Sequence, residues 1–209
     1  MKLLGHDTSA YVRRVRILLA ELQLSFERDT HGWLDPTPEF LAASPIHRLP
    51  VLDRGAGAAV RYLYDSRVIA EALYALPHPP PGGTPPFQGT LWNPDLDGLD
   101  RNVVSVSDGA LDALVNVFCL EADGIRPVQS PYLRRQEQRA ADCLDWLERL
   151  YAGRTTLDRC LSFADVSVLC TVGWIRFRNR MDLRPWSGLA KVEAAHRERP
   201  SLVATRPPA

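Results

Sequence analysis

The chain has 209 residues, enough for one large domain or two modest ones that each bury a core. Its 25 Lys and Arg residues balance its 25 Asp and Glu residues, so no global field draws it to nucleic acid or anionic lipid. The N-terminus turns polar too early for a signal peptide, and no apolar run suggests a membrane span. We therefore expect a cytoplasmic protein with small-molecule partners, no nucleic-acid partner and no membrane partner.

Residues 1–77 alternate strand-like and helix-like patterns, which predicts a small α/β domain. Apolar residues recur at helical spacing over 11–22 and 68–76, and a short helix is expected to start near residues 36–40. Strands are expected at 2–4, 24–28, 50–53 and 60–64. The arginines of the first helix fall largely on other faces than its apolar residues, which is typical of a solvated surface; they are Arg13, Arg14 and Arg16.

Prolines and glycines crowd residues 78–94, which cannot continue a helix or a strand and are interpreted as a linker. Helical spacing then dominates residues 95–209, with helices predicted over 95–121 and 131–152. A third helix is expected after Ser162-Phe163-Ala164-Asp165, which has the spacing of a capping box. The second part of the chain is thus predicted to be an all-helical domain.

The cysteines and histidines show no spacing typical of a metal site or a redox pair. The four cysteines include no CxxC pair and lie in the second half, mostly among apolar residues, so buried free thiols are expected there. The five histidines form neither HxxxH nor HExxH. We expect no bound metal.

Residues 8–16, 44–52, 65–66, 162–166 and 199–207 carry motifs that together resemble the glutathione S-transferase family over nearly the whole chain. Residues 44–52, Ser-Pro-Ile-His-Arg-Leu-Pro-Val-Leu, are followed by Asp65-Ser66, and together they resemble the family's two glutathione-holding segments. Residues 8–16 resemble a helix start found in bacterial members, and the segments 162–166 and 199–207 resemble the family's buried capping box and a common bacterial ending. The resemblance implies a thioredoxin-like α/β N-terminal domain followed by an all-α helical bundle.

The resemblance also implies how glutathione, as a co-substrate, is held. A cis peptide before Pro50 would leave the Leu49 N–H and C=O free to pair with the extended tripeptide, and Arg48 could meet its glycine carboxylate. Asp65-Ser66 at a helix N-terminus would hold the γ-glutamyl group, although either residue could simply cap that helix. The family's usual Asn, Gly, Lys and Val are replaced by Ser44, His47, Arg48 and Leu49, and His47 is a poor substitute at a glycine backbone position.

Ser9 aligns with the serine of serine-type members and is the expected catalytic residue. Its hydroxyl would donate a hydrogen bond to the glutathione sulfur and favour the thiolate. Lowering a thiol pKa from about 8.5 to about 6.5 needs roughly 2.7 kcal/mol. A hydrogen bond to a charged group, worth about 1.5 to 3 kcal/mol, and a helix N-terminus, worth about 0.3 to 1 kcal/mol, together suffice. Thr8 and Tyr11 are substitutes for this role, and an ordinary N-cap is the alternative interpretation of Ser9.

The resemblance thus implies a homodimeric glutathione transferase used in detoxification, which adds the glutathione thiolate to a small apolar electrophile. Two alternatives stay open. One is a glutathione-dependent isomerase or dehalogenase, and the other is a non-catalytic binding or scaffold protein that kept the fold. A serine where a CxxC would stand disfavours glutaredoxin-like exchange, which needs a sulfur nucleophile. The sequence does not identify the electrophile.

Overall fold

The computed structural model describes residues 1–32, 36–76, 91–92, 97–152 and 161–208. The chain divides into two compact units. The first contains Met1–Leu91, Cys160–Val166 and Arg197–Ala209, and the second contains Trp92–Arg159 and Ser167–His196. The tail therefore groups with the α/β part, whereas the sequence had suggested the helical part. Most of the predicted linker at 78–94 lies outside the described residues.

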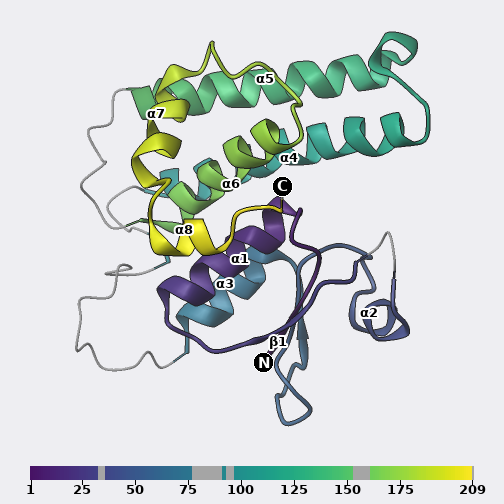
Figure 1. The fold of residues 1–209 in the computed structure, drawn as a ribbon, viewed down its shortest axis with the longest axis vertical. Coiled ribbons are helices and arrows are strands. Elements are labelled where there is room, and N and C mark those ends of the chain that lie inside the picture. The colour runs from purple at the N-terminus through teal and green to yellow at the C-terminus, as the bar shows by residue number, and fades with distance from the viewer. Residues whose placement is uncertain (33–35, 77–90, 93–96, 153–160, 209) are drawn as a thin grey trace. The chain divides into compact units, whose positions relative to one another are not determined.

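A small mixed sheet forms the centre of the first unit (Figure 1). Its strands are β1 (Lys2–Leu4), β2 (Glu27–Asp29), β3 (Val51–Asp53) and β4 (Tyr62–Leu63), in the order β2-β1-β3-β4. β1 runs parallel to β2 and antiparallel to β3, and β4 runs antiparallel to β3. β2 lies slightly later than the strand predicted at 24–28; the other strands lie within their predicted ranges.

Four helices belong to this unit among its described residues: α1 (Ala10–Glu21), α2 (Pro38–Ala43), α3 (Ser66–Tyr74) and α8 (Pro200–Ala204). α1 packs against α3, and α8 lies along α1 (Figure 1). Thr37 caps α2 by accepting the Phe40 N–H at 3.1 Å, and Phe40 is buried. Val15, Leu18 and Leu19 on α1 are fully buried, as the helical spacing predicted, and Val12 and Ile17 are fully buried as well.

The second unit is helical and contains α4 (Leu99–Ala122), the 3₁₀ turn η2 (Pro127–Gln129), α5 (Pro131–Ala152) and α7 (Ser187–His196). α6 (Phe163–Phe177) begins among the residues grouped with the first unit and continues into the second. α5 packs along α4 and also against α7. Glu148 on α5 accepts the Gly188 and Leu189 N–H groups at 2.7 and 2.9 Å, so its carboxylate neutralises the N-terminus of α7.

The predicted capping box at the start of α6 is confirmed. The Asp165 N–H donates to Ser162 Oγ at 3.0 Å, and the Ser162 N–H donates to Asp165 Oδ2 at 3.0 Å. The reciprocal pair satisfies two N–H groups that helix geometry leaves without a partner.

Two expectations from the sequence need correction. Cys119 and Cys143 are half-buried rather than buried, although Cys170 is buried and all three thiols are free; Cys160 lies outside the described residues. α4 is also long and apolar enough, by length and composition, to cross a membrane. A core helix passes the same test, and α4 buries Val103, Leu111 and Leu114 while packing along α5.

Candidate functional site

The strand register brings the predicted site segments to one end of the sheet. Leu4 at the end of β1 pairs with Val51 at the start of β3, and Leu63 at the end of β4 pairs with Leu52. Three segments therefore meet at this end of the sheet: the chain that leaves β1 toward Ser9, the turn that enters β3, and the start of α3. Motifs that are far apart in the sequence thus lie at a common location.

The turn before β3 is held by a buried serine. Ser44 is fully buried, and its Oγ donates to the Arg48 carbonyl at 3.2 Å while its own carbonyl accepts the His47 N–H at 2.9 Å. The peptide bond between Leu49 and Pro50 is cis, as the resemblance implied. Ser44 stands in place of the expected asparagine and therefore still stabilises the turn through these two hydrogen bonds.

Leu49 carries the main-chain groups that the sequence analysis assigned to the ligand. Neither its N–H nor its C=O has a recorded hydrogen bond to a residue that the structure describes. Its side chain is only 9% exposed, and a Cβ placed on Gly5 would lie 3.3 Å from it. The side chain thus anchors the turn against the segment that follows β1, while the backbone has a donor and an acceptor that no described residue occupies and that an extended peptide could use.

His47 stands where the resembled motif has glycine, and its backbone is left-handed. Its φ is +48°, in the left-handed region, where His is more frequent than most residues but still strained relative to glycine. We expected His47 to fit this position poorly. The turn nevertheless forms, with the hydrogen bonds between Ser44 and residues 47 and 48 in place. The His47 side chain is exposed and so is that of Arg48.

The start of α3 is capped by Asp65, whose Oδ1 accepts the Arg67 N–H at 2.9 Å. Asp65 is exposed, whereas Ser66 is 3% exposed. Asp65 therefore caps the helix. It can also bind a ligand, because a carboxylate has acceptor capacity for more than one donor. An anionic group at this end would also meet the positive end of the α3 dipole.

Ser9 is the N-cap of α1. Its Oγ accepts the Val12 N–H at 3.3 Å, and its backbone lies in an extended conformation. A hydroxyl that accepts one hydrogen bond still has its own hydrogen to donate. The half-buried Ser9 hydroxyl can therefore cap the helix and donate to a sulfur at the helix N-terminus in the same geometry.

The two substitutes for Ser9 have other contacts. Thr8 Oγ1 lies 3.0 Å from His6 Nδ1, so its hydroxyl is already engaged with that ring. The Tyr11 ring lies under the guanidinium of the fully buried Arg14, at 5.1 Å from its centroid. Ser9 remains the residue of this segment best placed for the predicted role.

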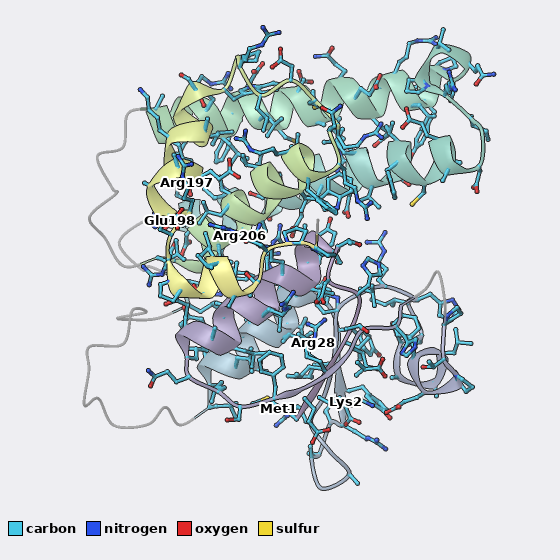
Figure 2. The ribbon with its side chains drawn as sticks, viewed as in Figure 1. Met1, Lys2, Arg28, Arg197, Glu198 and Arg206 are labelled. Carbon is cyan, nitrogen blue, oxygen red and sulfur yellow. The ribbon has the colours of Figure 1, made fainter. Side chains whose placement is uncertain are left out.

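An ion-pair network precedes Ser9, and the sequence analysis did not anticipate it. Asp7 Oδ1 accepts from Arg16 at 2.8 Å and from Arg28 at 2.7 Å, and Arg28 also donates to the Gly5 carbonyl at 2.8 Å. Figure 2 labels Arg28 near the sheet. Burial lowers the pKa of the Arg28 guanidinium, while the Asp7 charge opposes that shift. The network fixes both ends of the segment from Gly5 to Asp7, which leads directly into Ser9.

The arginines of α1 are not a simple solvated face. Arg14 is fully buried, Arg13 donates to the Leu202 carbonyl at 3.3 Å, and Arg16 donates to the Ala204 carbonyl at 3.2 Å. The interpretation of these residues as solvent-exposed was therefore wrong. Nothing in the sequence indicates these contacts, because the tail carbonyls accept from Arg13 and Arg16 only after the chain has folded back on α1.

The structure provides no cluster of three or more His, Cys, Asp or Glu side chains suited to a metal ion in the part of the chain that it describes. The polar groups gathered at the sheet edge are instead backbone amides and carbonyls, hydroxyls, a carboxylate and guanidinium groups. Such a set can bind a peptide with charged ends and can stabilise a thiolate by hydrogen bonding.

Comparison with known proteins identifies the family. The N-terminal domain model of glutathione S-transferases matches residues 8–76, and the C-terminal domain model matches residues 130–197. A curated relative in Escherichia coli K12, the uncharacterized GST-like protein YibF, is 28% identical over 179 residues, which is 85% of this chain and 83% of that protein.

Two solved structures are similar over almost their whole length. A glutathione S-transferase from Methylobacterium radiotolerans in complex with glutathione sulfonate is 30% identical, with a TM-score of 0.80, over 100% of this chain and 95% of that one. One from Methylobacillus flagellatus with bound glutathione is 26% identical, with a TM-score of 0.81, over 99% of each chain. With both domain models matched and this similarity along the entire chain, the protein belongs to the glutathione S-transferase family.

Proposed function

We propose that the protein binds glutathione at the edge of the sheet and adds its thiolate to a small apolar electrophile. The observation that carries this proposal is the position of Ser9, whose Oγ caps α1 and keeps a hydrogen to donate. Similar proteins bind glutathione or its sulfonate, which supports the same ligand here.

Each part of glutathione has a suitable receptor in this proposal. The Leu49 N–H and C=O pair with the main chain of the cysteine residue, in the manner of an added strand. Asp65 and Ser66, at the start of α3, hold the γ-glutamyl group, and Pro50 shapes the turn beside it. The exposed Arg48 guanidinium takes the glycine carboxylate.

Ser9 acts on the sulfur and attacks no bond itself. Its hydroxyl donates to the sulfur and, with the N-terminus of α1, favours loss of the thiol proton. The thiolate then attacks the electrophilic carbon, forming the C–S bond as the leaving group departs or as an activated double bond takes a proton. The proposal includes a homodimer in the cytoplasm, as the resemblance implied.

The test is a calorimetric titration with reduced glutathione near pH 7, with Asp65→Ala as the site variant and the exposed Glu71→Ala on the same helix as its matched control. Saturable binding that weakens in Asp65→Ala and persists in Glu71→Ala supports the site. No binding at millimolar glutathione would favour the scaffold alternative. Net consumption of glutathione with an electrophile distinguishes conjugation from isomerisation.

A further inference from the structure

The second unit contains an arginine among aromatic rings that no role described so far uses. Arg178, just after α6, has its guanidinium carbon 4.8 Å from the centroid of the Phe118 ring and 4.7 Å from that of Phe177. Trp174 meets Phe118 edge to face, with centroids 6.1 Å apart and planes at 82°. A half-buried cation is therefore surrounded by apolar rings from α4 and α6.

Arg178 has no carboxylate partner among the residues that the structure describes. Its contacts there are the two aromatic rings, and its Nε is buried without a hydrogen bond. Burial lowers the pKa of its guanidinium. Cation–π contacts offset part of the desolvation, but they leave the N–H donors of the guanidinium without acceptors.

The neighbouring arginine differs from Arg178 in having a carboxylate partner, although its Nε is likewise buried without a hydrogen bond. Arg180 also lies near Phe118, at 6.0 Å, yet its Nη2 forms an ion pair with Glu121 on α4. Glu121 is therefore committed to Arg180. The cluster has one neutralised guanidinium and one that still attracts an anion.

We propose that Arg178 is the receptor for the carboxylate of a small organic acid with an apolar, flat body. A guanidinium presents N–H donors in a fork that matches a carboxylate, and the half-buried rings of Phe118 and Phe177 provide apolar surface for the rest of such a ligand. A monoanion suits the site better than phosphate or sulfate dianions, because Glu121 nearby repels additional negative charge. This site goes beyond the proposed function and requires no glutathione.

The first experiment uses the whole protein without glutathione and compares benzoate with its neutral isostere benzamide by calorimetry. Benzoate is expected to bind saturably and about tenfold or more tightly than benzamide, because only the carboxylate pairs with the guanidinium. Equal affinities for the two compounds, or no saturable benzoate binding at about 10 mM, would overturn the proposal.

Variants then locate the site. Arg178→Met keeps an unbranched apolar stem without the charged guanidinium and should weaken benzoate binding about tenfold or more. The matched control is Arg176→Met, which removes an exposed arginine of α6 that is paired with Glu193 and should leave the affinity unchanged. Equal weakening in both variants would mean that general positive charge attracts benzoate, and the site would be rejected.

A last variant keeps the proposal testable if Arg178→Met does not fold. Arg178→Lys keeps the charge but loses the planar fork, so it should retain part of the preference for benzoate over benzamide. If Arg178→Met does not fold, as judged by circular dichroism, the comparison of the two compounds on the wild type and on Arg178→Lys still decides the proposal.

Discussion

Glu21 on α1 accepts two hydrogen bonds from the guanidinium of Arg199, at 2.6 Å from Nε and 2.8 Å from Nη2. The Glu21 carboxylate is 4% exposed and also accepts the Ser201 hydroxyl. A buried carboxylate with this set of donors is stable, but the same carboxylate without its cation is costly. The pair therefore connects the end of α1 to the start of α8.

We expect Arg199→Met to lower the free energy of unfolding by about 3 kcal/mol, because it leaves the buried Glu21 charge without its partner. Urea denaturation followed by circular dichroism measures the change. The matched control is Arg197→Met, since the Arg197 side chain is exposed and the substitution keeps its carbonyl, which accepts from Arg206 (Figure 2). Equal stabilities of the two variants would show that the Glu21 pair adds nothing.

The proposed role of Ser9 predicts a change in the ionisation of bound glutathione. In the wild type, the thiol pKa should fall from about 8.5 to about 6.5, and Ser9→Ala should return it by about one to two units. The thiolate absorbance near 240 nm, titrated with pH, reports the midpoint directly. Turnover should fall more than glutathione affinity, and an unchanged midpoint in Ser9→Ala would remove this residue from the mechanism.

Asp7 is expected to act as a positioning residue, because it holds Arg16 and Arg28 beside the segment that leads into Ser9. Asp7→Asn keeps the shape but not the charge, and it should cost about 1–2 kcal/mol of stability. It should also raise the thiol pKa of bound glutathione, whereas Asp7→Glu restores part of the effect. A loss of stability with an unchanged thiol pKa would assign Asp7 a structural role only.

The pair of Asp53 and Arg61 predicts a pH dependence of stability. Hydrogen bonds from Arg61 at 3.0 and 2.8 Å hold the pKa of the Asp53 carboxyl below its ordinary value, while burial opposes the shift. Because the folded pKa is the lower one, the unfolded chain binds more protons in acid. The stabilisation is complete above the unfolded pKa of about 3.9 and disappears as pH falls through the folded pKa.

Asp53→Asn should therefore lower Tm at pH 7 and reduce the further loss of Tm between about pH 5 and pH 2. Glu71→Gln, an exposed change on α3, provides the comparison. Thermal melts across this range measure both effects. Parallel Tm profiles for Asp53→Asn and the wild type would contradict the assigned cause.

The local patterns of the sequence predicted most elements because they depend on neighbours in the chain. The capping spacing of Ser162 and Asp165 and the helical spacing of α1 both reflect contacts within a few residues. The roles of Arg13 and Arg16 were missed, because their acceptors lie 189 and 188 residues later. Residue type alone does not reveal such partners.

The candidate site shows the same difference between what local motifs predict and what depends on distant contacts. The motifs predicted the turn at Leu49 and the cap at Ser9, and the strand register explains why they meet. The pairing of Asp7 with Arg28 could not be predicted, since it depends on β2 lying beside β1. The sequence analysis placed His47 at a glycine backbone position, and its φ is positive; the hydrogen bond from Ser44 to the Arg48 carbonyl could not be predicted, because it forms only in the folded turn.

The position of α8 along α1 has a consequence for the order of events during synthesis. α1 is complete when residue 21 has emerged, but the groups that cover Glu21 arrive only with residues 199–201. Throughout that interval the growing chain exposes a carboxylate and the arginine donors that the tail later satisfies. The first unit can thus be completed only after the helical unit has been translated, and a ribosome-bound chain that ends before residue 199 should remain sensitive to proteases in α1.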